Sequence, residues 1–80
     1  MEAKGAFNIE PIAKMLRLIE RVIKTRELDR QHHRDEFEKH FNYLLQGKDT
    51  LNPYERRQAG VTDEEWEAAK EEFKLCLKIK

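Results

Sequence analysis

Apolar side chains recur every three or four residues through most of this chain, the period of helices with one buried face. No run alternates polar and apolar residues over the length of a strand. The pattern predicts an all-α fold, a small antiparallel bundle of three to four helices, formed by one chain or completed by homodimerisation. One domain, residues 1–80, is expected to hold helices at about 9–26, 28–46, 53–59 (short) and 63–78.

The last helix has the clearest start signal in the sequence. The run from Thr62 through two acids to Glu65 is a capping box, in which side chains satisfy free N–H groups of the first turn. Val61 and Trp66 have the spacing of a hydrophobic staple across the same turn. We therefore predict that Trp66 is a core anchor that packs on Phe73 and on a residue of the second helix.

Residues 25–34 are almost wholly polar, but they contain no Gly or Pro to mark a break. One interpretation is a turn, with Thr25 or Asp29 capping the second helix. The other is the polar middle of one long helix, because the heptad phase of Ile23 continues to Phe37. A single helix of that length would leave so short a chain with little core, so we favour the turn.

The apolar face of the first helix is unusually wide. Met15, Leu18 and Val22 broaden its central stripe until apolar residues cover about half the circumference, more than a small bundle usually hides. These three side chains are therefore predicted to lie in a contact between chains. The alternative is that residues 1–8 or the 48–60 connection fold over them. The central stripe itself consists of Ile9, Ile12, Leu16, Ile19 and Ile23.

Charge sets broad limits on function. The chain has 16 basic and 16 acidic residues, spread evenly along it, which argues against nucleic-acid binding through bulk charge. The single cysteine, Cys76, indicates a reducing compartment. No stretch approaches the ~20 apolar residues of a membrane span, so we expect a cytoplasmic protein without membrane contact.

A local basic stripe is the main candidate for nucleic-acid binding. Its cations recur along one side of the first helix and could follow a phosphate backbone. Glu10 and Glu20 share that side and no aromatic residue is interleaved for base stacking, so a solvated face is the favoured interpretation. The stripe consists of Lys14, Arg17, Arg21 and Lys24.

Tyr54 and Arg57, in the short third helix, form a second candidate protein interface. Tyr and Arg are enriched in binding hot spots. The favoured interpretation is a capped connecting turn, started by Asn52 and Pro53, with Tyr54 packed on the core.

The most chemical-looking cluster is His32, Glu36 and His40. The run from His32 to Glu36 resembles the His-His-Glu helices of hemerythrin-like proteins, and that resemblance implies a di-iron site. The resemblance covers one helix, and no second ligand helix of that kind is present. Because residues i to i+8 span about 12 Å along a helix, one ion cannot be held by all three. We therefore predict no metal site and no cofactor.

Ingredients for catalysis are poor, since the chain has no Ser, no Gly-rich phosphate loop and no nucleophile beside an evident base. We predict a non-enzymatic protein–protein interaction module: a small regulator, inhibitor or assembly subunit, acting on a protein partner or on itself. Chains of this kind are common among phage-encoded accessory proteins, an analogy at the level of fold. The second hypothesis is a nucleic-acid-associated protein that uses the basic stripe, and the third is a metal-binding bundle.

Overall fold

The computed structural model describes residues 9–78, and within that range it contains helices and no strand. The all-α prediction is confirmed. The helices are α1 (Glu10–Lys24), α2 (Arg30–Leu45), α3 (Pro53–Gln58) and α4 (Asp63–Lys78).

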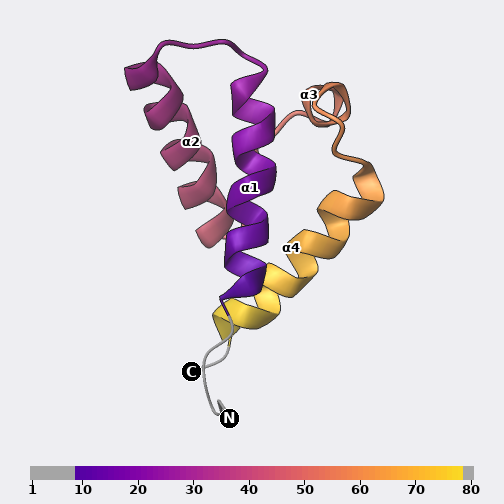
Figure 1. Cartoon of the computed structure of the whole chain (residues 1–80). Coiled ribbons are helices and arrows are strands. Elements are labelled where there is room, and N and C mark those ends of the chain that lie inside the picture. Colours follow the sequence, from indigo (N-terminus) through magenta and orange to yellow (C-terminus); the bar gives the residue numbers. More distant parts are fainter. Residues whose placement is uncertain (1–8, 79–80) are drawn as a thin grey trace.

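The central element of the fold is α1. It packs against each of the other three helices, and α3 also packs against α4. Figure 1 shows α1 standing between α2 and α4 and running opposite to both, with α3 beside the C-terminal half of α1. The side chains of α2 and α4 also meet, through Phe41 and Phe73, whose ring centroids are 5.8 Å apart.

This central position corrects the prediction of an exposed patch on α1. Met15 and Val22 are fully buried, and Leu18 is only 4% exposed, so all three belong to the core of the same chain. The prediction is wrong because α4 and α3 cover the flank that a smaller bundle would leave open. Of the predicted core stripe, Ile19 and Ile23 are buried and Ile12 and Leu16 are half-buried. Ile9 is 59% exposed, so its prediction as a core residue is wrong.

The alternative cover for α1 is correct in part. The 48–60 connection contains α3, which packs on α1, and Leu51, which is buried in the common core. The other proposed cover, residues 1–8, lies outside the described residues.

A turn, not a continuous helix, joins α1 to α2. Glu27 has a φ of +53°, in the left-handed region that residues other than glycine rarely adopt, and the chain reverses there. Asp29 then caps α2, because its carboxylate accepts the backbone N–H of His32 at 2.9 Å.

Capping also fixes the start of α4, as predicted. The Thr62 hydroxyl accepts the backbone N–H of Glu65 at 3.0 Å. Val61 and Trp66 on either side of that cap are both fully buried. Trp66 lies in the same core cluster as Phe73, so its prediction as a core residue is confirmed.

Candidate functional site

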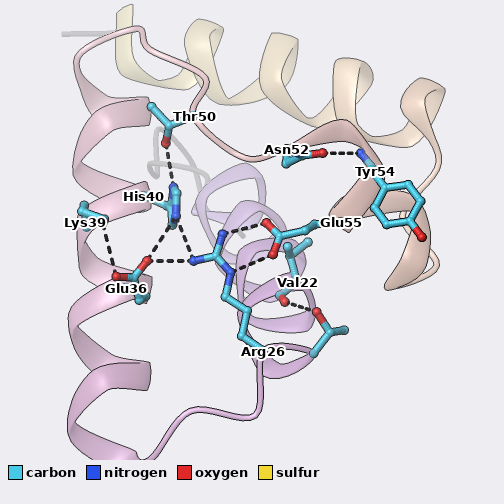
Figure 2. Close-up of polar contacts among 10 residues, drawn as sticks. Val22, Arg26, Glu36, Lys39, His40, Thr50, Asn52, Tyr54 and Glu55 are labelled. Atoms are coloured by element: carbon cyan, nitrogen blue, oxygen red, sulfur yellow. Dashed lines mark hydrogen bonds and ion pairs between the residues drawn. The ribbon is translucent and has the colours of Figure 1, made fainter.

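A polar network joins α1, α2 and α3, and we call it the Arg26 network. It brings together Arg26, just beyond α1, with two residues one turn apart on α2 and one residue on α3 (Figure 2). A threonine from the connection between α2 and α3 completes it. Its members are Arg26, Glu36, His40, Thr50 and Glu55.

Arg26 is the hub of this network. Its guanidinium holds Glu55 by two hydrogen bonds, Nε to Oε2 at 3.0 Å and Nη2 to Oε1 at 2.7 Å. The third nitrogen, Nη1, donates to Oε1 of Glu36 at 2.7 Å. Paired bonds of this kind combine charge attraction with fixed geometry, so Arg26 fixes α3 relative to both α1 and α2.

His40 is the buried member of the network, with 6% of its surface exposed. Its Nδ1 lies 2.6 Å from the Thr50 hydroxyl, and its Nε2 lies 3.4 Å from Arg26 Nη1. These neighbours fit a neutral imidazole whose Nδ1–H donates to Thr50 and whose Nε2 accepts from Arg26. Burial, followed by the Arg26 charge, holds the pKa of His40 below its ordinary value.

The carboxylates of the network are held in their ionised form. The hydrogen bonds from Arg26 lower the pKa of Glu55, and a bond from Lys39 lowers the pKa of Glu36. Bonding to Glu55 in turn raises the pKa of Arg26. With each charge matched by an opposite one, the arrangement suits a structural latch better than proton transfer.

A second residue of α3, next to Glu55, is anchored as well. Arg56 is buried, with its guanidinium carbon 5.2 Å from the centre of the Trp66 ring and its Nη1 3.6 Å from an Asp63 oxygen. From α1, Arg21 donates to the carbonyls of Ala59 and Gly60 at 3.2 and 3.3 Å. A side chain of α1 therefore binds the two carbonyls that directly follow α3.

Tyr54 and Arg57 are two of the exposed side chains of α3, beside Pro53 and Gln58, and we call this pair the α3 surface. Tyr54 is 64% exposed, so the favoured interpretation, in which Tyr54 packs on the core, is wrong. Arg57 is exposed and its Nη1 lies 3.2 Å from an Asp63 oxygen. The structure thus places this pair one helical turn apart in solvent.

The basic stripe of α1 is divided among other contacts. Arg17 bonds Glu10 at 2.9 Å, and Arg21 is bound to the backbone at the end of α3. Lys14 lines a surface hollow with both arginines, but Glu10 and Glu65 line the same hollow, and Lys24 is exposed. Two of the four cations therefore already have partners within the chain.

The histidines of α2 have separate partners. His32 Nδ1 lies 2.9 Å from Asp29, His33 Nε2 lies 3.0 Å from Glu20, and His40 belongs to the Arg26 network. Across residues 9–78, no group of three His, Cys, Asp or Glu side chains is arranged to hold a metal ion.

Sequence reasoning missed the Arg26 network. Arg26 meets partners 10 and 29 residues further along the chain, a separation that no local motif announces. The only available signal was the polar turn itself, in which an arginine follows the end of an apolar helix.

Comparison with known proteins leaves the geometry as the basis for function. No family model, curated protein or solved structure matches the chain. None of the described helices has the length and apolar character required to cross a membrane.

Proposed function

We propose that this chain is a non-enzymatic protein–protein interaction module and that the α3 surface is its binding site. The observation that carries the proposal is the 64% exposure of Tyr54 on a helix that Glu55 and Arg56 anchor to the rest of the molecule. The interface predicted on Met15, Leu18 and Val22 is given up because those side chains are internal.

Anchoring is what makes so short a helix useful. A helix of six residues is unstable alone, because nucleation fixes several residues for few hydrogen bonds. Here Arg26 holds Glu55, the Asn52 side chain caps the first turn at 2.7 Å, and Arg21 binds the Ala59 carbonyl directly after the helix. A partner therefore meets a surface that is already ordered, and the entropy lost on binding is smaller.

The chemistry of the α3 surface suits recognition. Tyr and Arg provide large contact area, a hydroxyl or guanidinium group, and the strongest enrichment in interface hot spots. Because the exposed Arg57–Asp63 pair contributes only about 0–1 kcal/mol, Arg57 can exchange Asp63 for a partner's carboxylate at little cost.

The partner is either a second protein or another copy of this chain. The antiparallel bundle completed by homodimerisation stays a prediction, and so does the cytoplasmic location. Light scattering over a range of concentrations distinguishes the two partners, because only self-association raises the mass of the isolated protein.

A capture experiment with matched variants tests the proposal. Tagged chain is incubated with extract of the organism that encodes it, and the proteins retained are quantified by mass spectrometry. The double variant Tyr54→Ala, Arg57→Ala should retain at least tenfold less of a specific partner than the parent. Truncating two hot-spot side chains removes about 2 kcal/mol or more of binding free energy. Leu75→Ala is the control, because Leu75 is comparably exposed but lies on α4.

The circular dichroism of the double variant should match that of the parent, since both side chains point into solvent. A partner retained equally by parent and double variant would contradict the proposal. Loss of the same partner in Leu75→Ala alone would place the binding surface on α4 instead.

A further inference from the structure

His40 lies where the Arg26–Glu55 attachment of α3 meets α2 and the connection that leads into α3. The groups facing it are Arg26 after α1, Glu36 and Lys39 on α2, Glu55 on α3, and the Thr50 hydroxyl of the connection (Figure 2). Two cations and two carboxylates surround the imidazole, so the cluster is electrically balanced when His40 is neutral. One added proton leaves one unmatched positive charge in a residue that is 6% exposed.

We propose that His40 makes the attachment of α3 sensitive to pH, and that proton uptake by its imidazole loosens α3 from α1 and α2. This inference rests on the proposed function for its consequence, which is regulation of the α3 surface. The loosening itself is a property of the isolated chain.

The loosening follows from the atoms involved. A proton taken from solvent binds the lone pair of Nε2, the atom that faces Arg26 Nη1 at 3.4 Å. The acceptor contact becomes a contact between two cations. The new Nε2–H also competes for Glu36 Oε1, which lies 3.6 Å away and is the acceptor of Arg26.

Arg26 must then give up Glu36 or move away from the imidazole. Either movement disturbs the same guanidinium that holds Glu55 and, through it, α3. The Nδ1–H bond to Thr50 is kept in both protonation states, so the response to the proton comes through Arg26 and its bonds to Glu55.

The direction of the effect follows from linkage. Because the pKa of His40 in the folded chain lies below the ordinary imidazole value of about 6.5, the unfolded or opened state binds the proton more readily. The stabilising contribution is complete above that ordinary value and is lost as pH falls through the folded pKa. His32 provides an internal contrast, since its bond to Asp29 raises its pKa.

Amide hydrogen exchange on the isolated full chain tests the proposal. Protection factors, corrected for intrinsic exchange at each pH, are compared for amides of α3 and α4 between pH 7.5 and 5.5. Ala59 and Val61 report on α3, because their N–H groups bond to carbonyls within it. Protection in α3 should fall relative to α4, by at most tenfold per pH unit for one proton.

The matched variant is His40→Asn, whose amide can reach the Thr50 hydroxyl but does not titrate; in it the ratio of α3 to α4 protection should stay constant. Imidazole NMR titration of the parent supplies a reading that needs no variant, and His40 should titrate at lower pH than His32. A flat ratio in the parent, a fall that persists in His40→Asn, or titration of His40 at or above the pH of His32 would overturn the proposal. None of these readings involves a partner, so a failed capture experiment leaves them intact.

Discussion

Replacing Trp66 with alanine should remove more stability than any other single truncation in α4. The side chain is fully buried where α4 meets the core. It also makes two polar contacts: its Nε1–H donates to Asp49 at 3.1 Å, and the Arg56 guanidinium stacks over its ring. The substitution therefore creates a cavity and removes partners from two charged side chains.

The magnitude can be bounded from these contacts. Truncating a buried Trp or Phe to Ala costs about 3–5 kcal/mol. A chain of 80 residues has a total free energy of unfolding of roughly 4–12 kcal/mol, so Trp66→Ala should leave the fold marginal. Trp66→Phe keeps an aromatic ring but loses the hydrogen bond to Asp49, and it should cost about 1–3 kcal/mol of stability. Asp49 still accepts a hydrogen bond from Lys70 at 2.8 Å in this variant.

Urea denaturation followed by circular dichroism at 222 nm measures both losses without relying on tryptophan emission. The expected order of stability is parent, then Trp66→Phe, then Trp66→Ala, with Leu75→Ala within about 0.5 kcal/mol of the parent. A loss below about 1 kcal/mol in Trp66→Ala, or red-shifted and freely quenched emission from the native parent, would refute the reasoning.

The remaining predictions concern the core, the network, acid and metal. Leu18→Glu should unfold the chain, because it places an unpaired charge in the core. A variant with the same thermal midpoint as the parent would show that Leu18 is not a core residue. Glu55→Gln should cost about 1–2 kcal/mol in urea, while Glu10→Gln, in an exposed pair, should cost under about 1 kcal/mol; equal losses would deny the network a special role. Arg26 lowers the pKa of Glu55. Burial alone would raise the pKa of Asp49, but hydrogen bonds from Lys70 and Trp66 outweigh it and lower that pKa. The two carboxylates therefore stabilise the fold above the ordinary carboxyl pKa of about 4, and this stabilisation is lost as the pH falls below that value. Urea midpoints at pH 6 and pH 3 check this, and a higher midpoint at pH 3 would contradict it. EDTA should leave the thermal midpoint unchanged, and elemental analysis should find well under one equivalent of zinc or iron; a lowered midpoint would indicate a metal site after all.

Much of the fold could be predicted because its signals are local. The Thr62 cap, the position of Trp66 one turn later and the Asn52–Pro53 start of α3 depend only on residues close in sequence. The same locality let Asp29 be considered as a cap for α2, although pattern alone did not exclude a continuous helix. Glu27, whose left-handed backbone conformation separates α1 from α2, has no recognisable sequence signal.

The width of the core on α1 could not be predicted for a physical reason. Helical periodicity tells which side chains share a face, but it does not tell how many neighbours cover that face. Leu18 is buried and Ile9 is exposed because α3 and α4 pack on one flank of α1 and Ile9 lies at its very start. The prediction assigned these two residues the opposite way.

Part of the candidate site could be predicted from local sequence and part of it could not. Tyr54 and Arg57 could be named as candidates from residue type alone, but the favoured interpretation packed Tyr54 on the core, because residue type does not show which side of a short helix faces solvent. Arg26 and His40 could not be joined from sequence, because their contact depends on the α1–α2 turn and on the placement of Thr50. Their importance is visible only in three dimensions.

Site-specific photo-crosslinking tests the central claim, recognition through the α3 surface, most directly. A photoreactive phenylalanine analogue is placed at Tyr54 in one preparation and at Leu75 in another, and both are irradiated in extract of the encoding organism. We predict a defined covalent adduct with one protein, or with a second copy of the chain, from position 54 and none from position 75. An adduct from position 75 alone, or no adduct from position 54, would contradict the claim that α3 presents the binding surface.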